Sequence, residues 1–248
     1  MDYLYDGSFD GFLTCVYYSY KSEKATGIYE KSSYQYSIIN DYKAIDTDTR
    51  LSDTVYNAIE KKISKEAMHM IYYAFLSCNE NKDNNILKFI EFGFKKGRTA
   101  VDMYTHESVL PVREMYTKVS REEHSFLGLL RFSDIDGILY AKYNPDNNIT
   151  ALVTEHFADR YKYEKFIIHD EKRKIASIYA NNHWEIIDAS IINIDELTKD
   201  EIMVHQLWKN YFTTLAIDER KNLNLQFQKV PVRYRKNIVE FNNIHSTE

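Results

Sequence analysis

Hydrophobic residues follow two different spacings along this chain, which predict helices and strands in separate stretches. Apolar residues recur every three or four positions from Phe9 to Tyr20 and from Ser52 to Phe94, as on one face of a helix. The segments Asp2–Tyr5 and Ile38–Ile45 predict short strands, and the polar residues 22–37 predict a surface loop. The first part of the chain is therefore expected to be mainly helical.

The second part of the chain combines strands with helices. Val109–Glu123 has the helical spacing, whereas Phe126–Phe132 alternates as the residues of a strand do. A turn at Asp134–Gly137 then leads to a returning strand at Ile138–Tyr143. The remaining elements that we expect are helices over Ile149–Phe157 and from a Thr198 cap to Phe212, strands at Phe166–His169, Lys174–Tyr179 and His183–Ile187, and a short last helix at Pro231.

This order of hairpin, helix and meander predicts an α+β fold. We expect a helical N-terminal part packed on an antiparallel or mixed sheet with flanking helices. At 248 residues, 44% of them hydrophobic, the chain can form one large domain or two small ones. We assign 1–98 to a strand-helix and helical region, 99–243 to an α+β unit, and 244–248 to a tail.

The two cysteines, Cys15 and Cys78, exclude several kinds of site. They form no C-x-x-C pair and no zinc spacing, and the chain lacks the three-cysteine motif that holds the cluster of a radical-SAM enzyme. Both lie in apolar segments, so we expect buried thiols in a reducing, cytoplasmic setting. The sequence has no evident signal peptide and no apolar run long enough to cross a bilayer.

The charge balance restricts how the chain could bind nucleic acid. The net charge is −5, whereas a protein that coats DNA is basic overall, so any contact must use a local patch. From Arg220 through Val239 the sequence has no acidic residue and interleaves basic with aromatic residues, which favours phosphate contacts and stacking. The alternative is a solvated face. The candidate nucleic-acid-binding residues are Arg220, Lys221, Lys229, Arg233, Tyr234, Arg235 and Lys236.

The turn Asp6-Gly7-Ser8 joins the first expected strand to the first expected helix, with Ser8 as the N-cap. Free backbone N–H groups at a helix N-terminus can hold a phosphate or a carboxylate, so this turn is a candidate substrate-binding site. The alternative is a capped turn that only locks the strand to the helix.

Two polar clusters on helices could carry chemistry. In Arg121–His124 a carboxylate beside an imidazole can orient it as a general base, although a solvated helix end is the alternative. His156, Asp159 and Arg160 share one side of a helix, with His156 at least partly buried in the apolar face. A His–Asp pair beside an arginine can bind an oxyanion or a phosphate, but a buried histidine can also be purely structural.

A third polar cluster lies where a strand ends at His169, with Asp170 and Arg173 in the turn that follows. We expect the three clusters to converge at one end of the sheet. The candidate catalytic residues are Glu123, His124, His156, Asp159 and His169, and the candidate substrate-binding residues are Asp6, Gly7, Ser8, Arg121, Arg131, Arg160 and Arg173. No metal site is predicted.

These motifs resemble a bacterial family called probable DNA metabolism proteins, which carries a domain of unknown function. The resemblance rests on Tyr5–Leu13, Arg121–Phe132, His156–Arg160, Ile168–Arg173, Leu207-Trp208 and Pro231–Tyr234. It implies a protein of DNA metabolism or repair that accompanies a radical-SAM protein. The iron-sulfur cluster and S-adenosylmethionine are then expected on that partner, with no cofactor in this chain. Some members are fused to a uracil-DNA-glycosylase-like domain, which we do not expect in this sequence.

Three functions remain open at this point. The first is nucleic-acid binding or processing together with a radical-SAM partner, without a membrane. The second is a non-catalytic scaffold or binding module whose histidines are structural. The third is a metal-dependent hydrolase that acts alone. Convergence of the polar clusters in one pocket favours an enzyme, and their dispersal favours a scaffold.

Overall fold

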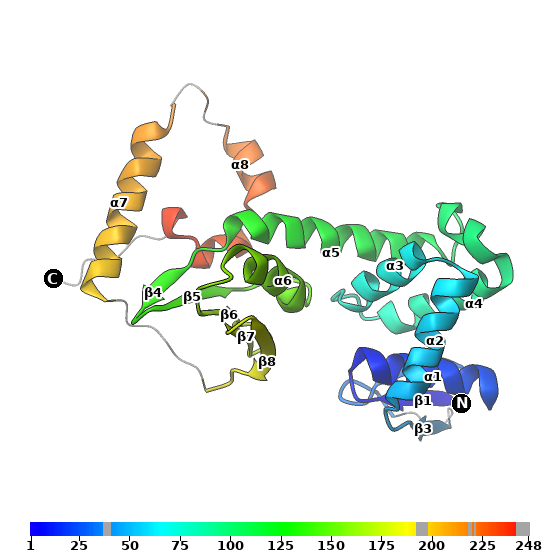
Figure 1. Cartoon of the computed structure of the whole chain (residues 1–248). Helices are drawn as coiled ribbons and strands as arrows, with labels where there is room; N and C mark the ends of the chain where they lie inside the picture. Colours follow the sequence, from blue (N-terminus) through cyan, green and yellow to red (C-terminus); the bar gives the residue numbers. More distant parts are fainter. Residues whose placement is uncertain (37–40, 192–197, 218–219, 221, 242–248) are drawn as a thin grey trace. The chain divides into compact units, whose positions relative to one another are not determined.

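Two structural units divide the chain, one at Met1–Ser120 and one at Arg121–Glu248 (Figure 1). The computed structural model describes residues 1–36, 41–191, 198–217, 220 and 222–241. Each unit combines helices with a sheet, so the expected α+β class is confirmed.

A three-stranded parallel sheet in the order β2-β1-β3 forms the centre of the first unit. The central strand β1 (Asp2–Tyr5) is buried along its whole length, and β2 (Gly27–Glu30) and β3 (Tyr42–Ala44) flank it. The predicted strand at the N-terminus is therefore confirmed. The strand expected from residue 38 begins at Tyr42, and residues 37–40 lie outside the described part of the chain.

The prediction of a surface loop over residues 22–37 is wrong at Gly27–Glu30, which form strand β2. Four residues there pair in parallel with β1, in register from Asp2 opposite Gly27 to Tyr5 opposite Glu30. Ile28 becomes fully buried as a result. A short strand among polar residues has no strong pattern of its own, and only its pairing with the distant β1 holds it extended.

Three helices of the first unit begin at side-chain caps. Ser8, Asp48 and Ser64 each accept a hydrogen bond from a backbone N–H of the following first turn. Gly97 ends the helix before it with φ 67°, a conformation that glycine adopts without a steric penalty. The helices are α1 (Phe9–Lys21), α2 (Thr49–Lys62), α3 (Lys65–Phe75), α4 (Lys82–Lys96) and the 3-10 helix η1 (Gly97–Asp102).

Aromatic rings from the sheet and the helices pack together in this core. The Tyr5, Phe12 and Phe75 rings have centroids 5.8–6.3 Å apart. Cys15 is buried beside them on α1, as predicted, whereas the expected burial of Cys78 is wrong. Cys78 follows the end of α3, beyond the last inward position of that helix.

A five-stranded mixed sheet in the order β4-β5-β6-β7-β8 forms the second unit. β5 and β6 are parallel and the other neighbours are antiparallel. The helix α6 (Thr150–Arg160) connects β5 to β6 and packs on β6 and β7. The strands are β4 (Ser133–Ile135), β5 (Ile138–Tyr143), β6 (Phe166–Asp170), β7 (Ile175–Ala180) and β8 (His183–Asp188).

The strand predicted over Phe126–Phe132 is wrong, because helix α5 (Leu110–Leu129) continues through most of it. Glu122, Phe126 and Leu130 recur every four residues and are all buried, so the helical face extends past Glu123. The predicted turn and the returning strand at Ile138–Tyr143 are confirmed, but the strand that pairs with it is Ser133–Ile135. Asp136 and Gly137 both have positive φ in the two-residue turn between these strands.

The C-terminal segment returns to helix, as predicted. Thr198 caps α7 (Lys199–Leu215) by accepting a hydrogen bond from the Glu201 backbone N–H, and Pro231 directly precedes a 3-10 helix that begins at Val232. The elements after α7 are α8 (Leu223–Lys229), η3 (Val232–Asn237) and η4 (Val239–Phe241). Within the described residues, no helix combines the length and the apolar character needed to cross a membrane.

Asp83 at the start of α4 should make the first unit less stable as pH rises. Its buried carboxylate accepts a hydrogen bond from the Tyr5 hydroxyl at 3.0 Å, and its Oδ1 has no hydrogen-bond partner among the described residues. Burial raises the pKa of Asp83 to about 6. Because the folded state favours the protonated form, stability should fall between about pH 4 and pH 6 and then level off.

We expect Asp83→Asn to stabilise the protein at pH 7.5 by up to about 3 kcal/mol and to lose this advantage near pH 4. Urea unfolding at both pH values measures the difference. The matched control is Asp53→Asn, at an exposed carboxylate of α2, which should change stability by less than about 0.5 kcal/mol at either pH. A variant that is no more stable than the wild type at pH 7.5 would contradict this account.

Candidate functional site

The N-terminal turn uses its polar groups within the fold. Asp6 Oδ1 accepts hydrogen bonds from the Ser8 backbone N–H at 2.9 Å and from the Ser8 hydroxyl at 2.6 Å, and Oδ2 accepts one from the Thr47 hydroxyl at 2.9 Å. Although burial opposes the shift, these hydrogen bonds lower the pKa of Asp6. Gly7 supplies the positive φ of 89° that the turn needs. A Cβ on Gly11 would lie 2.4 Å from Asp6 Oδ1. The geometry therefore favours the capped turn over an open anion site.

A buried carboxylate organises the polar residues of the second unit. Glu122 on α5 accepts hydrogen bonds from the backbone N–H groups of Asp146 and Asn147 at 2.6 and 2.8 Å, and from the Asn147 side-chain amide at 2.6 Å. The Tyr234 hydroxyl of η3 donates a further bond to it at 2.6 Å. Burial and the Glu122 carboxylate raise the pKa of Tyr234. These bonds tie together α5, the turn after β5 and the C-terminal segment.

Arg173 joins the same turn from the other side. Its guanidinium donates to the carboxylate of the fully buried Asp170 at 2.9 Å, and to the backbone carbonyls of Pro145 and Asp146. Asp170 also accepts from the backbone N–H of Arg173 at 3.1 Å. Asp170 and Arg173 are therefore explained by the turn that they build.

The histidines that sequence spacing selects lie in different surroundings. His169 on β6 is buried, its Nδ1 lies 2.7 Å from the Tyr140 hydroxyl, and burial lowers its pKa. His124 on α5 and His156 on α6 are exposed. The expectation that His156 is partly buried is wrong, because Val153 and Phe157 occupy the inward face of α6.

The other polar residues of these clusters do not form one group either. Asp159 is exposed and pairs with Lys162 at 3.0 Å. Arg121 is exposed at the start of the second unit, and Glu123 is partly buried. Two of the predicted residues, Arg131 and Arg160, line a common pocket.

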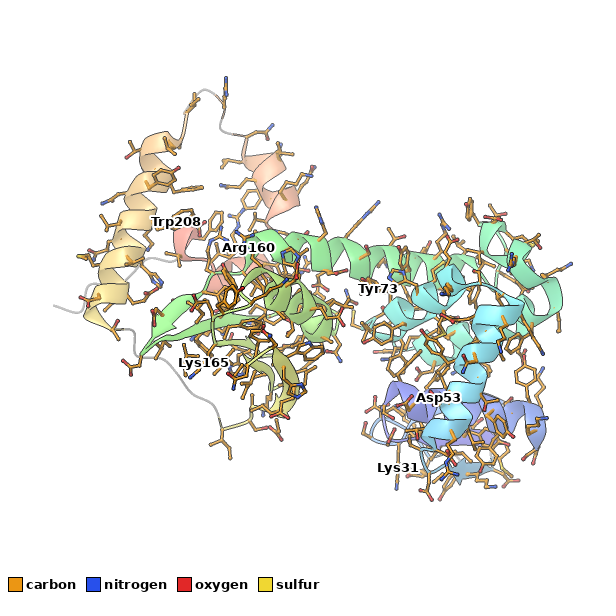
Figure 2. All side chains as sticks on the ribbon, in the orientation of Figure 1. Lys31, Asp53, Tyr73, Arg160, Lys165 and Trp208 are labelled. Atoms are coloured by element: carbon orange, nitrogen blue, oxygen red, sulfur yellow. The ribbon has the colours of Figure 1, made fainter. Side chains whose placement is uncertain are left out.

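This pocket lies in the second unit and has a volume of about 460 Å³. Four aromatic rings line it, together with Arg131, Arg160 and a Glu201–His205 pair on the first turns of α7. Figure 2 labels two residues of this lining, Arg160 on α6 and Trp208 on α7. The full lining is Leu127, Gly128, Leu130, Arg131, Phe132, Phe157, Arg160, Tyr161, Glu201, Val204, His205, Trp208 and Val239.

The two arginines of the pocket differ in their partners. Arg131 donates to Glu240 Oε1 at 2.6 Å and stands over the Trp208 ring at 5.8 Å. Although burial opposes the shift, the hydrogen bonds from Arg131 lower the pKa of Glu240. Arg160 is exposed and stands over the Tyr161 ring at 5.8 Å. It forms no ion pair within the described residues, so its charge is available to a ligand.

His205 resembles part of a catalytic triad, but its geometry differs. The Ser133 hydroxyl lies 3.0 Å and the Glu201 carboxylate 3.2 Å from the same atom, His205 Nε2. In a serine triad the hydroxyl and the carboxylate contact opposite ring nitrogens. This arrangement can position the imidazole at the pocket wall, but it does not activate Ser133. The described residues also contain no group of three or more His, Cys, Asp or Glu side chains that could hold a metal ion.

Sequence reasoning missed the residues of α7 that face this pocket. It placed His205 and Trp208 in a helical segment without assigning them a role. A signal was present, because Glu201 and His205 are four residues apart and so share one helix face with Trp208 nearby. What was absent was any indication that α7 meets the end of α5.

The basic C-terminal residues are only partly available for nucleic acid. Arg233 pairs with Asp146 at 2.8 Å, and Lys236 pairs with Glu171 at 3.2 Å. Tyr234 is buried, and Arg235 lies over the Phe227 and Phe241 rings at 4.6 and 4.4 Å. Arg220 and Lys229 are exposed, and Lys221 lies outside the described residues.

A family model described as a domain of unknown function, DUF4130, matches residues 80–240. The matched segment contains the Glu122 network and every residue that lines the pocket. None of the curated proteins matches the sequence.

The Glu122 network should be essential for the stability of the second unit. Glu122→Ala would leave its buried donors without an acceptor, so we expect a loss of about 3–5 kcal/mol in the free energy of unfolding. Tyr234→Phe removes one donor and should cost about 1–2 kcal/mol. Urea unfolding measures both changes, and Glu155→Gln at an exposed position of α6 is the matched control. Wild-type stability in Glu122→Ala would show that the network is dispensable.

Proposed function

This chain belongs to the DUF4130 family, a domain of unknown function, and we propose that it is a nucleic-acid-binding protein of DNA metabolism or repair that acts with a radical-SAM partner. The observation that carries the nucleic-acid part is the pocket lined by two arginines and four aromatic rings. Guanidinium groups bind phosphate, and aromatic rings stack on bases. The motifs that resemble DNA metabolism proteins include Arg131, Arg160 and Trp208.

An exposed apolar face on α7 supports the protein-partner part of the proposal. Its large hydrophobic side chains are each 39–59% exposed, and contiguous apolar surface of this kind marks protein interfaces. Leu207, Tyr211 and Leu215 follow one another at intervals of four residues, so they share one side of the helix, and none of them lines the pocket. The exposed residues are Met203, Val204, Leu207, Trp208, Tyr211, Phe212 and Leu215.

The radical-SAM identity of the partner rests on the sequence resemblance. In this proposal the iron-sulfur cluster and S-adenosylmethionine belong to the partner, since this chain lacks the three-cysteine motif. The partner would supply radical chemistry, and this chain would bind the nucleic acid on which that chemistry acts.

A non-catalytic binding module is a second candidate, and the polar network favours it. Glu122, Asp170 and Arg173 are used in hydrogen bonds that build the fold, and His169 is buried against Tyr140. In this version the chain recognises nucleic acid and delivers it, and every chemical step occurs on the partner.

Nucleic-acid binding should depend on Arg160. Because this guanidinium is exposed and without an ion pair among the described residues, Arg160→Ala should weaken binding roughly tenfold at low salt. It should also reduce the slope of log affinity against log salt by about one contact. Fluorescence anisotropy with a labelled oligonucleotide measures both.

Arg98→Ala, at an exposed arginine of η1 in the first unit, makes the same change of charge and is the control for this experiment. It should leave affinity and slope near those of the wild type. Equal affinities of the wild type and Arg160→Ala at low salt would exclude the pocket as the binding site.

The partner complex should depend on the apolar face of α7. Leu207→Glu and Leu215→Glu should abolish co-purification with the radical-SAM protein of the native host, because each buries a charge in the interface. Both side chains are more than half exposed, so the melting temperature should stay near that of the wild type. Gln206→Glu, an exposed position outside the apolar stripe, should retain the complex. Wild-type recovery of the partner by both leucine variants would contradict the proposal.

A further inference from the structure

We propose that the pocket receives one unstacked nucleotide of a single strand, with its base against the aromatic lining and its phosphate at Arg160. This inference rests on the proposed function and names its substrate class. The argument uses the size of the pocket, the chemistry of its lining and the charges around it.

The size of the pocket favours one nucleotide. Its volume of about 460 Å³ lies at the lower end of the range for sites that hold one small ligand, roughly 300–1,000 Å³. A base within a duplex is covered by its stacked neighbours, and its faces can contact the aromatic rings of a pocket only after it leaves the stack. A single strand presents such a base at lower cost than a duplex does.

The rings of the pocket come from separate elements of the unit. Phe132, Phe157 and Tyr161 form one cluster, in which the Phe157 and Tyr161 rings are nearly parallel at 10° and their centroids are 5.8 Å apart. Trp208 contributes an indole from α7. Aromatic lining accepts any of the bases, because every base has a π face.

The charges of the pocket favour an anionic ligand. Arg131 is neutralised by Glu240, whereas Arg160 forms no ion pair within the described residues. Glu201 contributes a carboxylate to the lining, 3.2 Å from His205 Nε2, and a neutral imidazole does not offset its charge. The lining therefore carries an available positive charge, although the whole chain has a net charge of −5. A phosphate group supplies the matching negative charge.

The surroundings of the pocket favour a strand over a free nucleotide. The two carboxylates of α7, Asp200 and Glu201, lie in its first turn, and from Ile202 to its end at Leu215 the helix has no acidic residue to repel a backbone that leaves the pocket in that direction. Exposed cations follow at Arg220 and Lys229. Backbone phosphates on either side of the bound nucleotide would be attracted to these cations.

Trp208 itself can report the binding. The chain has two tryptophans, so Trp184→Phe leaves Trp208 as the single indole. In this background we would titrate a single-stranded oligonucleotide, the matching blunt duplex, a nucleoside monophosphate and inorganic phosphate. We expect the single strand to quench Trp208 fluorescence with a dissociation constant at least roughly tenfold lower than that of the duplex or the monophosphate. Inorganic phosphate alone should leave the fluorescence unchanged.

Substitutions of the aromatic lining provide the second readout. Tyr161→Leu should weaken single-strand binding roughly ten- to hundredfold, as expected when a stacking partner of a base is lost. Tyr163→Leu is the matched control, because Tyr163 lies two positions further on, is 98% exposed and does not line the pocket. It should bind as the wild type does.

The outcomes separate this inference from the proposed function. Unchanged Trp208 fluorescence at oligonucleotide concentrations that saturate the anisotropy signal would overturn the pocket assignment, while nucleic-acid binding itself would stand. If the duplex binds as tightly as the single strand, the inference that the base is unstacked is wrong. If the monophosphate binds as tightly as the oligonucleotide, the inference that the ligand is a strand is wrong. The absence of any nucleic-acid binding would overturn the proposed function as well.

Discussion

The buried carboxylate of Glu122 is the interaction on which the second unit depends. A carboxylate in a protein interior is costly unless donors surround it, and here two backbone N–H groups, an amide and a phenol donate to it. The acceptor is on α5, whereas its donors come from the turn after β5 and from η3. Arg173 holds the same turn through two of its carbonyls. These bonds therefore hold the end of α5 and the C-terminal segment together, and residues of both line the pocket.

In the first unit, the carboxylate of Asp6 also accepts several hydrogen bonds that hold the fold together. Its carboxylate holds the Ser8 and Thr47 hydroxyls, and the missing side chain of Gly11 makes room for this contact. The local motif at the N-terminus and the motif around Arg121–His124 thus both contain a carboxylate that organises backbone. Much of the sequence signature that resembles the DNA metabolism proteins is accounted for by these folding roles.

The functional argument therefore rests on groups that the fold leaves unused. Arg160 has no ion pair within the described residues, Trp208 is more than a third exposed, and the apolar side chains of α7 remain open to solvent. Burial of these groups would be favourable if a ligand or a partner covered them. In the function that we propose, substrate binding and partner binding would therefore be neighbouring events on the second unit.

The sequence by itself determined the local elements of this protein. The N-terminal strand, the Ser8 and Thr198 caps, the Gly97 helix end and the three strands of the meander all follow from short windows of residues. The segment Phe126–Phe132 fits both the strand and the helix spacing. It is helical over most of its length because Glu122, Phe126 and Leu130 are buried on one helix face.

Only the tertiary structure decided which polar residues meet. Sequence spacing selected Glu123 and passed over the adjacent Glu122, although one position along a helix turns a side chain by about 100° and separates a buried carboxylate from a partly exposed one. The bond between Tyr234 and Glu122 joins residues 112 positions apart. The pocket likewise joins the ends of α5 and α6 to the first turns of α7. No local pattern encodes such contacts, because they depend on how distant segments pack once each has formed.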